Sequence, residues 1–499
     1  MAQESFDVVV IGSGISGLAA ATKCACSGKS VLLLEGQRQF GGFINPFRRR
    51  GYSFDPGVHY LAGMGADQPL GREMEALGIS PDTYMRELDP ERFDDFVFPD
   101  YRVSMCRGKE RFHARLEEDF PQEKDGLKEF FEILDCVDAA IDAQQSGKRD
   151  LASLGSLIYY KGANYSDLLD DCTTDLRLRA VLSGLVGDIG LAPSQTDAIT
   201  FVALMTYLLR GTYFPKGGSG PWRDAFLDRL RTYGATLRKR STVERIVVEN
   251  DRAVGVITKD EREIRCKQVI SCIDAKSTLR KLVGSAHLPP KLDYLLEDVV
   301  YGPGSLCVFL GLRRNPADWG LKDQNLWHFP SYDIDRDYER LANGELSGNI
   351  PFVVNSPSYK ASAGKCDSKH TVYLCALAPW KKFMRWQHEP VLRRSDAYMK
   401  LKCELGESLI RQAERYLPGL SQEIEIREFS TPLTNRSYVS VPQGAIYSLA
   451  DTPEQAGFYR RFSEIPLPGL HLAGSAVAGA GVHVCMQSGL KAADAALKA

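Results

Sequence analysis

The hydrophobic pattern is most informative at the start of the chain. An unbroken apolar run at residues 8–11 leads into a glycine-rich turn, and an alanine-rich segment of helical character follows. A second apolar run, residues 31–34, ends at Glu35. Fully apolar runs of this length are typical of strands buried on both faces of a parallel sheet. The pattern therefore predicts strand, turn, helix, strand and acid, the order of a dinucleotide-binding unit.

Three glycines in the turn have distinct expected roles. Gly12 permits the tight turn after the strand, Gly14 lets backbone approach a pyrophosphate, and Gly17 lets the helix lie close to the sheet. The phosphates would then meet the free amides of a helix N-terminus. Glu35 is placed to accept hydrogen bonds from ribose hydroxyls, and an acid here disfavours a 2′-phosphate. We therefore expect FAD or NAD rather than NADP.

Two further glycine loops narrow the choice of cofactor. Gly41 and Gly42 close a loop shortly after the acid, where bare backbone can lie against a flavin ring. Near the C-terminus, an apolar strand at residues 470–473 is followed by the Gly474 turn and by a helical pattern over residues 482–497. The amides and the positive dipole at the start of that helix would stabilise negative charge on a reduced flavin. Together these loops favour FAD over NAD.

Helical patterns dominate the first half after the opening unit. Residues 70–210 are expected to be mainly helical, for example over residues 127–141 and 173–186, where apolar residues recur at spacings of three and four. A glycine-rich crossing then precedes an expected helix at residues 222–233.

Strand patterns return in mid-chain and beyond. Residues 235–273 hold three short alternating runs separated by turn residues, which predicts a β-meander. Residues 306–312 and 371–377 are strand candidates inside a long aromatic-rich stretch of mixed character. Because 499 residues are too many for one hydrophobic core, we expect two domains. The expected fold class is mixed α/β, with a Rossmann-type dinucleotide domain interleaved with the second domain.

Composition and charge exclude several classes of function. The net charge is −2, which gives no indication of a nucleic-acid partner. The twelve cysteines include no CxxC pair, and no cluster has metal-ligand spacing, so we expect no metal site and reduced thiols in a cytoplasmic compartment. We see no basic and apolar leader and no apolar run of the roughly 20 residues that a membrane span needs.

Five motifs in this order resemble one family of flavoproteins. They are VVVIGSGISGLAAA, FDPGVHYLAG, YFPKGGSG, TPLTNRSYVSVPQGAIY and GLHLAGSAVAGAGV, and they span nearly the whole chain. They resemble the all-trans-retinol 13,14-reductase (retinol saturase) branch of the phytoene desaturase and carotenoid isomerase flavoproteins. The first and last motifs are shared with a wide superfamily that includes amine oxidases, whereas the middle three are more specific to the branch.

The resemblance implies a domain division and a set of contact residues. It implies an FAD domain of the glutathione-reductase and amine-oxidase kind, split over residues 1–70, 214–285 and 461–499, and a substrate domain from residues 71–213 and 286–460. The contacts that it implies are Gly12, Ser13, Gly14, Ser16, Gly17 and Glu35 for the ADP half, Gly41 and Gly42 for the flavin, Gly57, Val58, His59 and Tyr60 beside the isoalloxazine, Val243 for adenine, and Gly474, Ser475 and Val482 for the pyrophosphate and flavin.

Two departures from the family pattern affect the expected substrate and surroundings. Amine oxidases of the superfamily often carry an acid where this chain has Ser475, which disfavours an amine substrate. The retinol saturase branch tends to be acidic around residues 379–387, where this chain has Lys381, Lys382 and Arg385 among aromatic residues. Such a composition suits a peripheral membrane contact. A solvated helix with buried aromatic residues is the competing interpretation.

The cofactor determines the expected chemistry. Flavin N5 exchanges hydride with a polyene carbon, and the protein supplies a dry channel for a hydrophobic substrate. In saturation, a proton is also added at the partner carbon. His59 is the titratable side chain on the segment expected to face the flavin, so it is a candidate proton donor, and Tyr60 is a second candidate.

Several alternatives remain open at this stage. The same scaffold could desaturate or isomerise such a substrate, or act on a polyketide polyene. A different class is a flavin-free prenyl-binding chaperone of the Rab GDP dissociation inhibitor kind, against which Glu35 and the C-terminal glycine loop argue. No second glycine motif with strand context is seen, because Gly184, Gly187 and Gly190 follow a helical pattern, so the electron donor is not identified.

Overall fold

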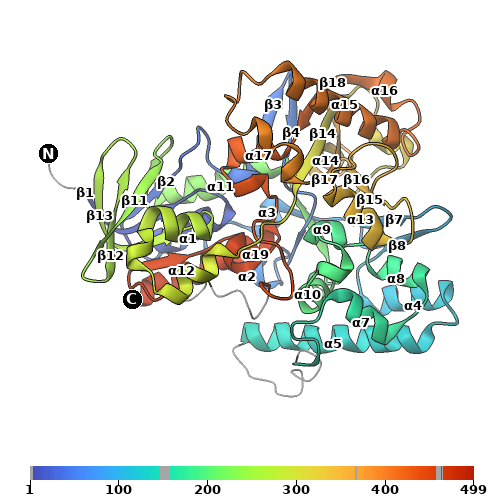
Figure 1. Ribbon diagram of the computed structural model, residues 1–499, viewed down its shortest axis with the longest axis horizontal. Helices are drawn as coiled ribbons and strands as arrows, with labels where there is room; N and C mark the ends of the chain where they lie inside the picture. Colours follow the sequence, from blue (N-terminus) through green and yellow to red (C-terminus); the bar gives the residue numbers. More distant parts are fainter. Residues whose placement is uncertain (1–3, 147–157, 366–367, 457–461, 463–464) are drawn as a thin grey trace.

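Two seven-stranded sheets lie side by side along the long axis of the molecule (Figure 1). The computed structural model describes residues 4–146, 158–365, 368–456, 462 and 465–499. In the first sheet the order is β10-β2-β1-β13-β12-β11, with β19 paired to β13. Its strands are β1 (Glu4–Ile11), β2 (Val31–Leu34), β10 (Thr236–Arg238), β11 (Val243–Glu249), β12 (Arg252–Thr258), β13 (Glu263–Ser271) and β19 (Leu470–Leu472).

The opening pattern folds as predicted, into a strand, a helix and a strand in one layer. β1 pairs in parallel with β2 and with β13, and α1 (Ile15–Cys26) connects β1 to β2. The predicted meander is confirmed for β11, β12 and β13, which pair antiparallel. The three strands do not form a sheet of their own, however, because β13 joins the parallel strands. The run at residues 236–238 pairs in parallel with β2 instead.

Alternate residues of the first strands serve two different cores. Val8 and Val10 belong to the core shared with α1, whereas Val9 and Ile11 belong to the core on the opposite face. All four side chains are at most 4% exposed, and burial of one such side chain stabilises the fold by about 1.5–3 kcal/mol. A strand buried on both faces needs no polar positions, which explains why the sequence run is unbroken.

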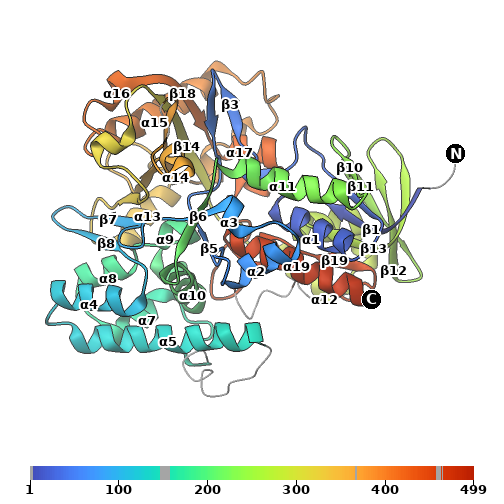
Figure 2. The ribbon, with the colours of Figure 1, turned by 180° about the vertical axis from the view of Figure 1, so that it is seen from behind.

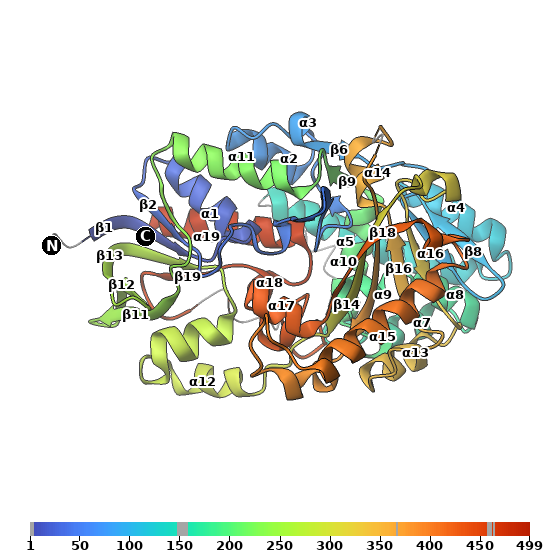
Figure 3. The same cartoon turned by 90° about the horizontal axis from the view of Figure 1, so that it is seen from above.

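Helices cover both faces of the first sheet. Figure 2 shows α11 (Ser219–Thr232) and α19 (Val482–Lys498) on the same side as α1, and Figure 3 shows α12 (Pro290–Glu297) on the other side. A π-helical segment, Ser277–Gly284, contributes Leu279 and Leu282 to the second core. The helix predicted at residues 222–233 corresponds to α11, which begins three residues earlier, at Ser219.

Close packing around α1 depends on two glycines, Gly489 where α19 meets α1 and Gly17 where α1 meets the end of β1. A Cβ atom on Gly489 would lie 2.1 Å from the carbonyl oxygen of Ser16, and one on Gly17 would lie 1.9 Å from the carbonyl oxygen of Gly12. Neither position has room for another residue. Gly17 therefore has the role that was predicted for it, close packing of the helix on the strand end.

The second sheet has the order β18-β14-β17-β16-β15-β7-β8. Its neighbours are antiparallel except for β15 and β7, which pair in parallel. The strands are β7 (Asp94–Val97), β8 (Arg102–Met105), β14 (Gly304–Leu312), β15 (Asn325–His328), β16 (Phe352–Asn355), β17 (His370–Ala378) and β18 (Ile424–Ser430). β14 and β17 contain the two strands that were predicted in this stretch.

A group of helices lies below the second sheet in Figure 1. It consists of α4 (Lys109–Asp119), α5 (Lys124–Ser146), α7 (Tyr165–Cys172), α8 (Leu176–Leu182), α9 (Val186–Ile189) and α10 (Ala198–Leu209). The helix expected at residues 127–141 lies within α5. The continuous helix expected over residues 173–186 is wrong, because the chain turns between α8 and α9. At this turn a Cβ atom on Gly184 would lie 2.5 Å from the ring of Phe96.

Short elements complete the fold. They are β3 (Phe47–Arg49), β4 (Tyr52–Phe54), β5 (Leu61–Ala62), β6 (Met85–Glu87), β9 (Thr212–Pro215), α2 (Pro69–Ala76), α3 (Pro81–Tyr84), α13 (Ile334–Ala342), α14 (Pro357–Ser362), α15 (Asp396–Ala413), α16 (Leu420–Glu423), α17 (Pro432–Val439) and α18 (Ser475–Ala478). Residues 379–387 form two 3₁₀ turns rather than the expected helix. Within the described residues, none of the helices combines the length and the apolar character that crossing a bilayer requires.

The division into domains remains a proposal. We retain residues 1–70, 214–285 and 461–499 as the FAD domain and residues 71–213 and 286–460 as the substrate domain.

Substitution of Gly489 by alanine tests the close contact between α1 and α19. The added methyl group meets backbone, which cannot move aside alone, so we expect a loss of about 1–3 kcal/mol in the free energy of unfolding. Denaturant unfolding of the protein measures this loss. Ala495→Ser adds one atom at an exposed position of the same helix and should lower stability by no more than about 0.5 kcal/mol. Equal stability of Gly489→Ala and the parent protein would contradict the packing described here.

Candidate active site

A cavity of about 1970 Å³ lies between the two sheets. One end is formed where the parallel strands of the first sheet finish, by Gly12, Glu35, Cys272 and Gly474. The carboxyl edge of a parallel sheet is where open α/β folds bind ligands. The volume is roughly twice the upper end for a typical single-ligand pocket, so the cavity can hold a dinucleotide together with a second molecule.

The glycine turn presents free backbone to the cavity. Gly12 has a φ of +91°, a conformation that other residues rarely adopt. A Cβ atom on Gly14 would meet no atom within 4 Å, so the start of α1 faces open space. The first N–H groups of a helix have no partner within the helix, and here they border that space. An anion fits this position through both the amides and the helix dipole.

Glu35 connects the glycine turn to the next loop. Its Oε2 accepts hydrogen bonds from the backbone N–H of Ser13 at 3.0 Å and from the Ser13 hydroxyl, and Oε1 accepts the Gln37 amide at 2.8 Å. The Gly41 N–H in turn donates to the Ser13 hydroxyl oxygen at 3.2 Å. Because each carboxylate oxygen can accept more than one bond, Glu35 can fix both loops and still accept a ribose hydroxyl.

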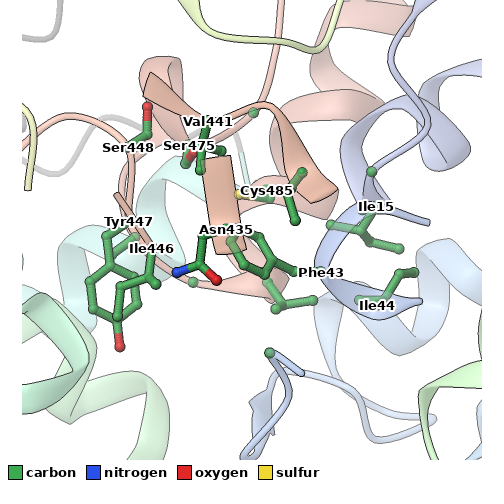
Figure 4. A pocket seen from close by; sticks show the side chains of 18 of the residues that line it. Ile15, Phe43, Ile44, Asn435, Val441, Ile446, Tyr447, Ser448, Ser475 and Cys485 are labelled. Atoms are coloured by element: carbon green, nitrogen blue, oxygen red, sulfur yellow. The ribbon is translucent and has the colours of Figure 1, made fainter. Parts of the chain in front are cut away.

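The C-terminal glycine loop places two helix starts on the same cavity. Gly474 has a φ of +105°, and its N–H donates to the Ser488 hydroxyl at 3.1 Å. Ser475 begins α18 and Val482 begins α19, and both residues line the cavity. Figure 4 shows Ser475 and Cys485 in the same close-up as Ile15 and Phe43 from the N-terminal segment.

The predicted site residues come together from distant parts of the sequence. Those that line the cavity are Gly12, Ser13, Gly14, Ser16, Glu35, Gly41, Gly42, Gly57, His59, Tyr60, Val243, Gly474, Ser475 and Val482. Gly17 lies behind the turn. Val58 is 1% exposed and belongs to the hydrophobic core, so its side chain is turned away from the cavity.

His59 is held in a neutral state. Burial, together with the nearby charge of Lys360, lowers its pKa to about 3. Its Nδ1 lies 3.1 Å from Asn355 Nδ2, which donates to it, so Nε2 carries the proton in the neutral ring. The ring also lies 4.7 Å from that of Tyr373. A neutral imidazole held in this way is a weak acid and suits positioning better than proton donation.

Tyr60 and Asp188 form a second titratable pair on the cavity wall. The Tyr60 hydroxyl donates a hydrogen bond to Asp188 Oδ2, and both residues line the cavity. Burial raises the pKa of Asp188 to about 6, while the bond from Tyr60 and the charge of Lys360 oppose the rise. Burial and the neighbouring carboxylates raise the pKa of Tyr60 well above its usual range. Tyr60 therefore keeps its proton at neutral pH, whereas Asp188 changes its protonation state near pH 6.

A buried polar network holds the segment that carries His59 and Tyr60, on the side away from the cavity. Lys360 Nζ donates to the carbonyl oxygen of His59 at 2.8 Å and to Asn325 Oδ1 at 2.5 Å. Asn325 and Trp327 each donate to Asp94 Oδ1 at 2.8 Å. Burial raises the pKa of Asp94 and lowers that of Lys360. Lys360, linked to Asp94 through Asn325, thus fixes the backbone of the segment that carries His59 and Tyr60.

The sequence did not identify several of the residues that line the cavity. Asp188 lies in the glycine-interrupted helical stretch, and nothing in that stretch indicates that it meets Tyr60. Asn435 lies within the TPLTNRSYV motif, which marked the family without giving this residue a role. His483 lies at the start of α19 and lines the cavity, and burial lowers its pKa to about 4. The sequence does contain one indication that His483 faces the site, because His483 lies two residues after Gly481, the last glycine of the C-terminal loop.

Comparison with known proteins decides the family. The model of the family described as flavin containing amine oxidoreductase matches residues 15–497, almost the whole chain. The chain belongs to this family. It is an FAD-dependent oxidoreductase, and the expectation of FAD is confirmed over NAD and over a flavin-free chaperone.

Individual relatives of this flavin-containing oxidoreductase agree with the resemblance seen in the motifs. It is 27% identical to an all-trans-retinol 13,14-reductase of Danio rerio over 89% of this chain and 77% of that protein. It is 26% identical to a chloroplastic prolycopene isomerase of Daucus carota over 98% of this chain and 79% of that protein. A solved oxidoreductase from Methanosarcina mazei shares the fold, with a TM-score of 0.66 and 14% identity, covering 98% of this chain and 100% of that one. The predicted fold class and resemblance are thus confirmed.

Alanine in place of Gly14 tests the glycine turn as the phosphate site. The Gly14 backbone is extended, with φ −59° and ψ 175°, and its Cβ would enter open space, so the apoprotein should keep its stability within about 1 kcal/mol. The methyl group would occupy space that the phosphates need, and we expect FAD affinity to fall about 10- to 100-fold. Flavin fluorescence titration of apoprotein measures the affinity, with the exposed Lys29→Ala as control. Unchanged affinity would contradict this assignment.

Proposed function

We propose that this oxidoreductase reduces a carbon–carbon double bond of a hydrophobic conjugated polyene of the retinoid or carotenoid class. The observation that supports this proposal most directly is that the two ends of the cavity differ in polarity. Its polar end is the glycine turn and the C-terminal loop, whereas its other end is lined by apolar side chains from the second sheet and from helices below it. Among these are Leu204, Phe329, Leu341, Phe352 and Leu377.

The relatives support the same class of substrate. One is named for a retinol reductase and another for a carotenoid isomerase, and both names refer to conjugated isoprenoids. Ser475 at the C-terminal loop, in place of an acid, disfavours an amine substrate. The apolar end of the cavity can also exclude water from a polyene held there.

The protein residues position the cofactor and supply the proton. The residues fit FAD: the turn at Gly14 would take the pyrophosphate and Glu35 the ribose, as the open space and the free acceptor positions allow. Bound FAD supplies hydride transfer to and from carbon. Tyr60 donates a proton to the partner carbon of the reduced double bond while Asp188 passes its own proton to Tyr60, so that no tyrosinate is left in the buried site.

The mass of the product separates reduction from isomerisation, which is the second candidate because a prolycopene isomerase is among the relatives. Chemically reduced holoenzyme is incubated without oxygen with all-trans-retinol or with carotenes. We expect a product two mass units heavier. An unchanged mass with a shifted retention time would instead favour the isomerase, and loss of hydrogen with oxidised enzyme would favour a desaturase.

Tyr60→Phe should remove the proton donor while leaving the cofactor site intact. General acid catalysis contributes typically about 10²- to 10⁴-fold, so the rate of polyene reduction should fall by about that factor. Flavin content and reduction by dithionite should remain those of the parent protein. Tyr294→Phe changes a tyrosine that is 65% exposed and serves as the control. A full rate in Tyr60→Phe would exclude this donor.

The pH dependence of the same step tests Asp188. In this coupled transfer Asp188 must be protonated when Tyr60 donates, and its protonated fraction falls as pH rises through about 6. The single-turnover rate should therefore be highest below that pH and fall about tenfold per pH unit above it. Asp188 interacts electrostatically with several other titratable groups. These are Tyr60, Asp94, Tyr338, Lys360, Cys375 and Tyr447.

Asp188→Asn keeps an acceptor for Tyr60 but removes the titration, so its rate should be low and independent of pH between about 5 and 8. A flat profile for the parent protein would contradict the assignment.

A peripheral membrane contact is proposed at the cavity mouth. Val391, Leu392 and Tyr438 line the cavity and are 43%, 86% and 55% exposed. In the predicted segment 379–387, Phe383 and Trp386 are buried, so its contribution is restricted to exposed side chains such as Met384 and Arg385. Exposed apolar and basic side chains at an entrance suit an anionic lipid surface. A cytoplasmic location remains our prediction.

Leu392→Asp should weaken that contact. It places a negative charge at the cavity mouth, so we expect several-fold less protein to sediment with phosphatidylserine vesicles. Leu176→Asp is the matched control, because Leu176 is 69% exposed and lies on α8 outside the cavity lining. Equal loss of binding in both variants would show a general charge effect rather than a contact at the mouth.

A further inference from the structure

Two cysteines lie side by side on neighbouring strands of the second sheet, at the wall of the cavity. Cys307 on β14 and Cys375 on β17 are directly opposite in the antiparallel register, and their sulfur atoms lie 3.7 Å apart. Directly opposite residues of such a pair have Cα atoms about 4.5–5.5 Å apart, which is within the range that a disulfide spans. A small movement of the two side chains would therefore suffice to form an S–S bond.

Hydrogen bonds prepare Cys307 for thiolate chemistry. The Tyr373 hydroxyl donates to its sulfur at 3.1 Å, and the Ser305 hydroxyl oxygen lies 3.2 Å away. The Cys307 thiol donates to that serine oxygen, to which Asn435 Nδ2 also donates at 3.1 Å. Burial would raise the pKa of Cys307, but the contacts with Cys375, Ser305 and Tyr373 together lower it. Polar groups of this kind are unusual around a cysteine that only fills space.

The pair also borders the site that the cofactor and substrate share. Cys375, Tyr373, Ser305 and Asn435 line the cavity. Tyr373 contacts His59, on the segment expected to lie beside the flavin ring. Cys375 is thus accessible from the cavity, whereas Cys307 is 3% exposed and lies behind it. Because Cys375 borders the cavity and Cys307 lies behind it, an external thiol can attack Cys375 in a disulfide of the pair and release Cys307.

We propose that Cys307 and Cys375 form a dithiol–disulfide couple that delivers two electrons to the bound flavin. In this step the two thiols lose two protons and two electrons, one S–S bond forms, and FAD takes up both electrons and both protons. A small external dithiol then attacks the disulfide at Cys375, restores both thiols and leaves as its own disulfide. The proposal rests on the proposed function, which consumes reduced flavin and leaves its source open.

Peptide mapping tests the couple without any turnover. Holoenzyme is treated with diamide, its remaining thiols are alkylated, and the unreduced digest is analysed by mass spectrometry. We expect a peptide pair joined through Cys307 and Cys375, two hydrogen masses lighter than the sum of its parts. Cys403, which is exposed on α15, should be recovered alkylated. Absence of the joined peptides would overturn the proposal, and this measurement needs no variant to fold.

Anaerobic reduction by dithiothreitol tests delivery to the flavin. The bleaching of bound FAD is followed in the parent protein, in Cys307→Ser, in Cys375→Ser and in Cys403→Ser as the control. We expect the first two variants to bleach about 100-fold more slowly than the parent and Cys403→Ser to match it. Dithionite, which needs no thiol relay, should bleach all four at one rate. Bleaching by dithiothreitol at the parent rate in Cys307→Ser and Cys375→Ser would overturn the proposal.

The two proposals fail in different ways. If dithionite-reduced enzyme does not reduce a polyene, the proposed function fails, whatever the thiols do. If it does, and yet the serine variants take electrons from the dithiol normally, only the dithiol couple fails.

Discussion

The open N-terminus of α1 is the feature on which the rest of this site depends. Its amides border the cavity because Gly14 has no neighbour on that side, and Gly17 and Gly489 allow α1 to lie close to the strand end and to α19. Glu35 then fixes the turn and the following loop through Ser13. A site for a pyrophosphate is thus built mainly from backbone, held by one buried carboxylate and by close helix packing.

The second half of the site is organised by buried polar groups of the other sheet. Lys360, Asp94 and Asn325 hold the segment with His59 and Tyr60, although burying charges costs free energy unless they are paired and hydrogen-bonded. Burial, together with the charge of Lys360, keeps His59 neutral, and Tyr60 on the same segment is bonded to Asp188. We therefore propose a positioning role for the histidine and proton transfer for the tyrosine, two candidates that the sequence could not separate.

Local sequence patterns predicted many of the helices and strands. They predicted very few of the contacts between residues that are far apart in the chain. The strand, turn and helix at Gly12 to Gly17 depend on neighbouring residues, so a single sequence reveals them. The pairing of Tyr60 with Asp188 joins residues 128 positions apart, and that of Cys307 with Cys375 depends on strand register. The interruption between α8 and α9 was also missed, because the ring of Phe96 that packs on Gly184 comes from another part of the chain.

The central claim is that one cavity brings FAD and a polyene together for hydride transfer. Anaerobic single-turnover spectroscopy tests it most directly: dithionite-reduced holoenzyme, freed of excess reductant, is mixed with all-trans-retinol or a carotene while the flavin and polyene bands are followed together. We expect the flavin to reoxidise as the polyene band is lost, one polyene per flavin. A flavin that stays reduced while the bound polyene is unchanged or only isomerised would contradict the account.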